Sequence, residues 1–189
     1  MSNCSEDLWL VCADRVTCTH WDERPIVNNQ PMTVDLLVIH NISLPPAESE
    51  EDFDNQYVED FFSGQLDCSA HPIFSELEGV RVSAHLFIKR SGQVIQFVPL
   101  NYRAWHAGLS EFNGRQRCND FSVGIEMQGT DLIPYTDAQY DSLVKVTKEI
   151  QGLFPGILKQ NIVGHEHIAP KRKTDPGPSF DWNRYKNRI

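Results

Sequence analysis

Two segments far apart in the sequence carry side chains of the types that bind metal ions. Segment 164–177 holds two histidines, an aspartate and two lysines, and the strand-like run 34–40 ends on another histidine. Zinc binds imidazole nitrogen and carboxylate oxygen, and a catalytic zinc usually has three protein ligands with one position left open. His40, His165 and Asp175 can supply such a set, so metal binding is the leading interpretation.

The other histidines leave alternatives open. A single histidine at a strand end is more often a hydrogen-bonded polar group than a ligand, which applies to His40 taken alone. His167 would face the same side as His165 in an extended segment, and it could compete as a ligand or lie behind the site. We favour His165 because it directly follows a strand. His85 and His106 are interpreted as hydrogen-bonded residues near the site or in the core.

Composition limits the class of protein. The chain has 189 residues, 40% of them hydrophobic and 23% charged, which predicts a single domain over residues 1–189. A net charge of -9 argues against nucleic acid as a partner, and an anionic substrate would need local arginines. Independently of the charge, we expect a small-molecule substrate and a monomer.

No apolar run approaches the roughly 20 residues of a membrane-spanning helix, and the N-terminus is acidic where an export signal would be basic. The five cysteines form no CxxC pair, which favours reduced thiols. The sequence therefore predicts a cytoplasmic protein that is not inserted in a membrane.

Hydrophobic patterning predicts an α/β fold with a central mixed sheet flanked by helices. The apolar run 34–39 is typical of a strand in the middle of a sheet. The alternation over 80–88 predicts a half-buried strand, joined by a turn at 90–93 to a partner strand at 94–98. The acidic, proline-containing loop 44–52 after His40 is solvated and could border a cleft.

Three more elements follow along the chain. Residues 121–127 alternate as a strand, and 161–164 form a short strand that ends directly before His165. Thr136 and Gln139 form a capping-box pair at the start of a helix that ends near Phe154. Strand ends are where open α/β sheets bind ligands, so His40, Glu126 and His165 can converge.

Glu126 is the second chemically informative residue. A carboxylate on an apolar strand costs free energy unless it is paired or functional. An ion pair with Arg117 or Lys173 is one explanation, and general base catalysis is the other. Lys173 and Asp175 are two residues apart in a segment that Pro176 makes extended, so both can project to the same side.

Five segments resemble one enzyme family over nearly the whole chain, from about Trp9 to Trp182. The segments are Val38–Pro46, Arg81–His85, Arg103–Gly108, Arg117–Glu126 and Arg172–Pro178. They look like the AmpD-type cytoplasmic N-acetyl-anhydromuramoyl-L-alanine amidases. The chain departs from the family pattern at Glu166 and His167, where members carry a cysteine and an aspartate.

The resemblance implies a zinc hydrolase of the amidase-2 fold. Its zinc ligands would be His40, His165 and Asp175, with Glu126 and Lys173 as the catalytic pair. Such enzymes cleave the amide between the lactyl group of anhydro-N-acetylmuramic acid and L-alanine, in wall fragments returned to the cytoplasm for recycling. In many bacteria the same fragments signal β-lactamase induction, which links the family to antibiotic resistance.

The resemblance also implies a substrate-binding set. Arg81 and Arg117 would bind peptide carboxylates, Asn41 would contact the peptide, and Trp105 would border the sugar. Taken without the family, the alternative is that Arg117 is a solvated loop charge, and for Trp105 a core position is favoured. Two other functions remain open, a binding module without turnover and a zinc hydrolase of another amide. A pure binding module would have no use for the catalytic pair, which favours an enzyme.

Overall fold

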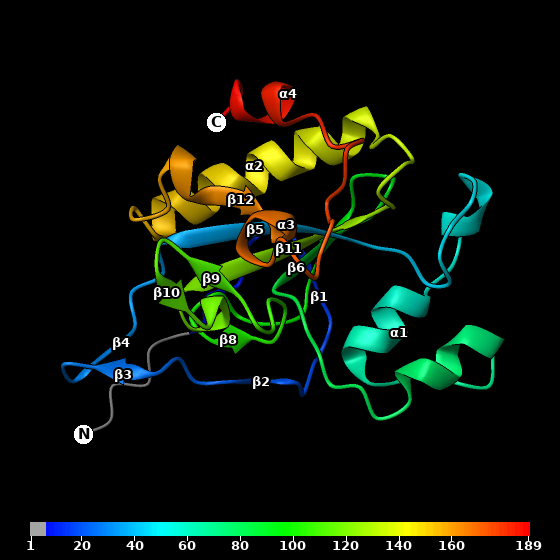
Figure 1. Cartoon of the computed structure of the whole chain (residues 1–189), viewed down its shortest axis with the longest axis horizontal. Coiled ribbons are helices and arrows are strands. Elements are labelled where there is room, and N and C mark those ends of the chain that lie inside the picture. Colours follow the sequence, from blue (N-terminus) through cyan, green and yellow to red (C-terminus); the bar gives the residue numbers. More distant parts are fainter. Residues whose placement is uncertain (1–6) are drawn as a thin grey trace.

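The computed structural model describes residues 7–189, which form one domain around a six-stranded mixed sheet (Figure 1). In spatial order the strands are β1 (Asp14–Arg15), β7 (Val94–Gln96), β6 (Leu86–Ile88), β11 (Ser122–Gln128), β5 (Leu36–Ile42) and β12 (Ile162–Gly164). Neighbouring strands are parallel except for the β6–β7 hairpin. The predicted mixed sheet, the internal position of β5 and the hairpin are confirmed.

Shorter elements surround this sheet. Three two-stranded ladders within residues 7–189 pair β2 (Trp21–Asp22) with β8 (Arg103–Ala104), β3 (Ile26–Val27) with β4 (Gln30–Pro31), and β9 (Glu111–Phe112) with β10 (Arg115–Gln116). The helices are α1 (Tyr57–Ser63), α2 (Asp137–Leu153), α3 (His165–Ile168) and α4 (Trp182–Lys186). Short 3-10 turns cover Glu51–Phe53, Pro72–Leu77, Cys118–Asp120 and Lys159–Asn161.

Helix α2 covers one face of the sheet, with α4 outside it (Figure 1). It begins as predicted, because Thr136 Oγ1 accepts from the Gln139 N–H at 3.1 Å and the Gln139 side chain accepts from the Thr136 N–H at 3.1 Å. Its apolar side, including Leu143 and Ile150, packs on sheet residues such as Ile39 and Ile125. This burial makes α2 the main support of the sheet.

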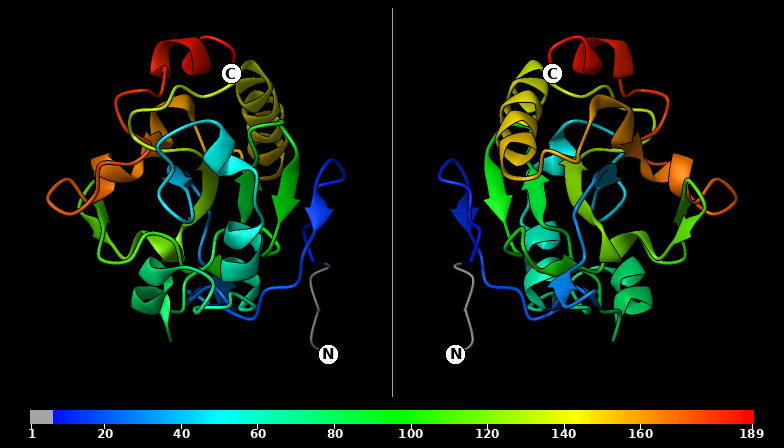
Figure 2. Two further views of the ribbon diagram at one scale, coloured as in Figure 1. Left: turned by 90° about the vertical axis from the view of Figure 1, so that its right-hand side faces the viewer. Right: turned by 90° about the vertical axis from the view of Figure 1, so that its left-hand side faces the viewer.

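The opposite face is covered by α1 and by loops, which lie on the side away from α2 (Figure 2). Phe62 of α1 packs with Phe87 and Phe97 there. The prediction of a half-buried strand over 80–88 is therefore wrong. Only Leu86–Ile88 is a strand, Phe87 is fully buried, and Val80 is 41% exposed in the preceding loop. The alternating pattern predicted the wrong burial because α1 and loops pack apolar residues on this face of the sheet as well.

Membrane-spanning helices are absent from residues 7–189, since none of the helices combines the required length with sufficient apolarity. Four cysteines, Cys12, Cys18, Cys68 and Cys118, are free thiols as expected. Residues 1–6, which include Cys4 and belong to the acidic N-terminal segment, lie outside the described part of the chain.

Candidate metal centre and active site

The three predicted metal ligands meet at one end of the sheet. His40 lies in β5, and His165 opens α3 directly after the neighbouring strand β12. Asp175 lies on the loop after α3, where its carbonyl oxygen accepts from the Glu166 N–H at 3.0 Å. His40 Nδ1 is 3.0 Å from His165 Nδ1 and 3.0 Å from Asp175 Oδ2, and the latter two atoms are 3.1 Å apart. All three side chains are buried.

Hydrogen bonds on the far side of each ring decide which nitrogen is free. His165 Nε2 lies 3.1 Å from the Ala107 carbonyl oxygen, which can only accept, and 3.3 Å from Arg172 Nη2; a proton on Nε2 satisfies the carbonyl and leaves a lone pair on Nδ1. His40 Nε2 lies 2.9 Å from His106 Nδ1, and His106 Nε2 lies 3.0 Å from Ser122 Oγ. Through this series of hydrogen bonds, His40 can donate from Nε2 to His106, which leaves the lone pair of its Nδ1 available, as in His165.

This donor set fits a zinc ion. Tetrahedral zinc, with ligand distances of about 2.0–2.2 Å, places neighbouring ligand atoms roughly 3.3 Å apart, close to the separations seen here. Burial lowers the pKa of His40 to about 4, which keeps the ring in the neutral form that binds metals. Burial alone would raise the pKa of the Asp175 carboxyl, but its bonds to His165 and His40 hold it below its ordinary range. Three atoms with lone pairs therefore lie close together, and only a cation or a shared proton can offset their mutual repulsion.

A glycine on β11 makes room for the ring that supports His40. A Cβ atom on Gly124 would lie 2.4 Å from Cγ of His106, so no side chain fits there. Ser122, on the same face of β11, bonds the far nitrogen of this ring. The pattern Ser122, Gly124, Glu126 thus serves the site, while the alternate residues of β11 pack under α2.

Glu126 lies beside the ligands because β11 and β5 pair with Glu126 opposite His40. Its side chain is buried, and its Oε2 atom has no hydrogen-bond partner. Burial raises the pKa of Glu126 well above its ordinary value, repulsion from Asp175 adds to this, and Lys173 partly offsets it. The alternative of an ion pair with Arg117 is not supported, because Arg117 pairs with Asp120 Oδ2 at 3.2 Å.

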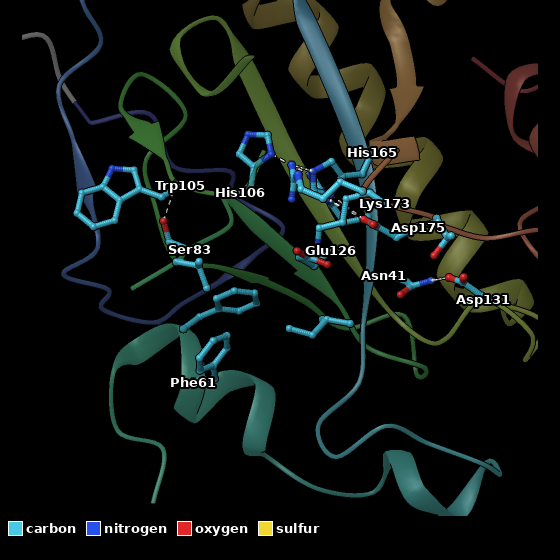
Figure 3. Close-up of a pocket in the computed structure, with 16 residues that line it drawn as sticks. Asn41, Phe61, Ser83, Trp105, His106, Glu126, Asp131, His165, Lys173 and Asp175 are labelled. Atoms are coloured by element: carbon cyan, nitrogen blue, oxygen red, sulfur yellow. Dashed lines mark hydrogen bonds and ion pairs between the residues drawn. The ribbon is translucent and has the colours of Figure 1, made fainter. Parts of the chain in front are cut away.

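These residues line a cavity of about 470 Å³ (Figure 3). Its other predicted members are Lys173, Asn41 and Trp105. Trp105 is half-buried, stacks near His20 with ring centroids 6.1 Å apart, and donates from Nε1 to Asp22 Oδ1 at 3.1 Å. The cavity therefore combines the metal donors, a buried acid, a lysine and an aromatic wall.

Two predicted substrate-binding residues lie outside this cavity. Arg81 lines a smaller cavity of about 180 Å³, which shares Phe61 with the main one. Arg117 lines a third, of about 340 Å³, and its side chain is 72% exposed. Residues 44–56 do not line the main cavity, so the loop after His40 does not border it as expected.

The expectation that His167 faces the same side as His165 is wrong. Residues 165–168 form a helical turn, so the two side chains point in different directions. His167 Nδ1 accepts from the Gly164 N–H at 3.1 Å, and its ring packs edge-on against Trp182 at 5.7 Å. His167 therefore closes the start of α3, and His165 alone joins the ligand set.

The interpretation of His106 as a hydrogen-bonded residue near the site is confirmed, since it supports His40 and lines the cavity. Sequence analysis missed two other residues of the site. Arg172 donates to the carbonyl oxygens of Ala107 (2.8 Å) and Leu109 (2.9 Å), which holds that loop beside His165. Asp131 accepts from the side chain of Asn41. Its position in a polar turn directly after β11 was the available signal.

Comparison with known proteins agrees with this geometry. The family model Amidase_2, N-acetylmuramoyl-L-alanine amidase, matches residues 30–178. The chain therefore belongs to the Amidase_2 family of N-acetylmuramoyl-L-alanine amidases. Within that family it is of the AmpD type, as the following similarities show.

The chain is 51% identical over 181 residues to 1,6-anhydro-N-acetylmuramyl-L-alanine amidase AmpD of Escherichia coli strain K12, covering 96% of this chain and 94% of that protein. A crystal structure of a selenomethionine AmpD derivative matches with a TM-score of 0.89 and 49% identity over 96% of each chain. The E. coli amidase AmiD, in complex with the substrate anhydro-N-acetylmuramic acid-L-Ala-D-gamma-Glu-L-Lys, matches with a TM-score of 0.62 and 27% identity, covering 87% of this chain and 61% of that one. The predicted amidase-2 fold is confirmed.

Proposed function

We propose that this protein is a zinc-dependent amidase that cleaves the bond between the lactyl group of anhydro-N-acetylmuramic acid and L-alanine of the stem peptide. The observation that carries the proposal is the position of Glu126, a buried acid with an unpartnered oxygen, next to three converging metal donors. The names of the AmpD relatives and the ligand of the AmiD complex supply the substrate class.

His40, His165 and Asp175 would hold the zinc ion. When bound, zinc acts as a Lewis acid that polarises a carbonyl group and makes water easier to deprotonate. His106 and the Ala107 carbonyl oxygen orient the two imidazoles through their Nε2 atoms. The protein thus presents two imidazole nitrogens and one carboxylate without further rearrangement.

Glu126 is the general base in this proposal. Its raised pKa makes the carboxylate a stronger proton acceptor than an exposed glutamate. It would take a proton from the attacking water at Oε2 and return it to the leaving nitrogen of L-alanine. Both transfers would occur within the cavity that Glu126 lines.

Lys173 is the second catalytic group. It lines the same cavity, and its charge acts on the Glu126 carboxylate. An ammonium group here would stabilise the negative charge that builds on the carbonyl oxygen as the amide is attacked.

The remaining predicted residues would hold the substrate. Trp105 would border the sugar and Asn41 the peptide, and both line the cavity. Arg81 and Arg117 would bind carboxylates of the stem peptide from the two smaller cavities. Because they stand apart from the reacting bond, their contribution would be to affinity.

The biological setting is part of the same proposal. The resemblance to recycling amidases would place the reaction in the cytoplasm, on fragments that also govern β-lactamase induction, with the enzyme acting as a monomer. Deleting the gene should raise β-lactamase in a host with an inducible enzyme. Unchanged induction in that strain would remove this part of the proposal.

The direct test is hydrolysis of anhydromuramyl-tripeptide by the purified protein. We expect zinc-loaded protein to release the free peptide, exhaustive chelation to abolish release, and added zinc to restore it. Full turnover after complete removal of metal would overturn the metal mechanism. Release from the AmpD substrate but not from unrelated amides separates this function from a zinc hydrolase of another amide.

A further inference from the structure

Two groups that only accept hydrogen bonds hold the side-chain amide of Asn41 in one orientation, and the Tyr135 hydroxyl is a further partner. Its Nδ2 lies 2.8 Å from Asp131 Oδ1 and 3.1 Å from the carbonyl oxygen of Pro176. A carboxylate and a carbonyl cannot donate, so the NH₂ group must face them and Oδ1 must face away. Figure 3 shows the nitrogen of Asn41 directed at Asp131 and the oxygen on the side of Glu126. Asn41 therefore presents an acceptor to the cavity.

Asp131 is itself fixed by the chain segment that follows the metal ligand. Its carbonyl oxygen accepts from the Ser179 N–H at 3.1 Å. Gly177, at a φ of 82°, packs so closely that a Cβ atom there would lie 2.3 Å from the Asp131 Cα. Pro176 is held in turn by Tyr135, whose hydroxyl donates to the Pro176 carbonyl oxygen at 2.8 Å. The acceptors around Asn41 thus form a rigid unit.

We propose that Asp131 is a positioning residue for peptide specificity: by holding the Asn41 NH₂ group, it directs Asn41 Oδ1 to accept from a backbone N–H of the stem peptide. Trp105 and Asn41 lie on opposite sides of Glu126 (Figure 3), so a substrate with its sugar at Trp105 runs its peptide past Asn41. Without Asp131 only the Pro176 carbonyl oxygen still accepts from the NH₂ group, so the amide is freer to rotate and present its donor instead. This inference rests on the proposed function, because the donor it needs belongs to the muropeptide.

A double-mutant cycle tests whether Asp131 acts through Asn41. For kcat/KM on anhydromuramyl-tripeptide, we expect Asn41→Leu and Asp131→Leu each to lose about tenfold, and the double variant to lose no more than either alone. Additive losses of about a hundredfold would mean that Asp131 acts independently of Asn41, which overturns the proposal.

An exchange variant protects the test against simple misfolding. Asn41→Asp alone brings two carboxylates together, whereas Asn41→Asp combined with Asp131→Asn keeps one donor and one acceptor between the two positions. We expect the exchange to recover part of the kcat/KM lost in Asn41→Asp, at least about threefold, because one donor is restored between the two positions while the Pro176 carbonyl oxygen still lies beside an acceptor. Failure of this rescue in a folded, metal-loaded variant counts against the proposal.

A modified substrate gives a measurement that would not change if Asp131 had a purely structural role. Wild-type protein should disfavour, by about tenfold, a tripeptide substrate N-methylated at its second peptide residue, and Asp131→Leu should lose most of this discrimination. Asp67→Asn, in an exposed loop, is the matched control and should discriminate like wild type. Discrimination that persists in Asp131→Leu overturns the inference, whereas a wild-type protein that releases no peptide at all overturns the proposed function instead.

Discussion

The metal site and the two arginines proposed to bind peptide carboxylates are positioned differently by the fold. His40, Glu126 and His165 lie on or directly after adjacent parallel strands, whose register sets their separation. Arg81 and Arg117 lie on loops, outside the main cavity. Strand pairing converts spacing along the sequence into position in space, whereas a loop residue is placed by packing that spacing does not encode. Catalysis should therefore depend strongly on the first group and weakly on the second.

The largest effect is expected from His165→Ala. Loss of one of three metal donors should abolish stoichiometric zinc binding and lower kcat/KM by more than about a thousandfold. His167→Ala is the matched control, since His167 faces Gly164 and Trp182, and it should keep the metal. Metal analysis of both variants checks this. Zinc loss in His167→Ala would mean that α3 does not hold in solution.

Glu126→Gln should come next. We expect it to retain zinc but to lose about a hundredfold or more in kcat, because a general base is removed while the fold and ligands remain. Because burial raises the pKa of Glu126, the acidic limb of the wild-type kcat/KM profile should lie above the ordinary range of a glutamate. Near wild-type turnover in the variant would assign the base to another group.

A smaller effect is expected at His106. His106→Leu removes the acceptor for His40 Nε2 and should weaken zinc affinity about 10- to 100-fold. His106→Asn can still accept from His40, so it should lose less. Competition with a zinc chelator measures both affinities. Equal zinc affinity in the wild type and both variants would show that the metal ligands do not need support from His106.

The loop arginines should matter least for turnover. Arg81→Ala and Arg117→Ala are expected to raise KM up to about tenfold for substrates with free peptide carboxylates and to leave kcat nearly unchanged. Comparing substrates with and without these carboxylates is the measurement. A large fall in kcat would mean that these loops close over the reacting bond, which would remove the contrast between the two groups.

The free energy of unfolding should also depend on the protonation of Glu126, by a small amount. Its raised pKa means that the folded protein binds this proton more tightly than the unfolded chain, so the free energy of unfolding falls as pH rises from about 4.5 through the folded pKa. Metal-free Glu126→Gln should be more stable than wild type above this window, by on the order of 1 kcal/mol, with no gain below it. Urea unfolding at several pH values checks the sign. A gain that grows toward acid pH would contradict it.

Prediction from sequence succeeded where one local signal was sufficient. The capping pair at Thr136 defined the start of α2, and the apolar run before His40 defined β5. It failed at residues 80–85, where alternation predicted a strand but the chain forms a loop, and at His167, which lies in a helical turn. In both cases the outcome depends on packing partners distant in the sequence: α1 for the first, Trp182 for the second.

The sequence by itself determined which reactive groups the protein has, because residue types at strand ends and the family motifs identify the metal donors, the acid and the lysine. Only the tertiary structure decided which of these groups meet. The 3.0 Å contact between His40 and His165, the support from His106 and the hold of Asp131 on Asn41 join residues far apart in the sequence. Such contacts arise from strand register and from the close packing allowed by Gly124 and Gly177, which act only once the chain is folded.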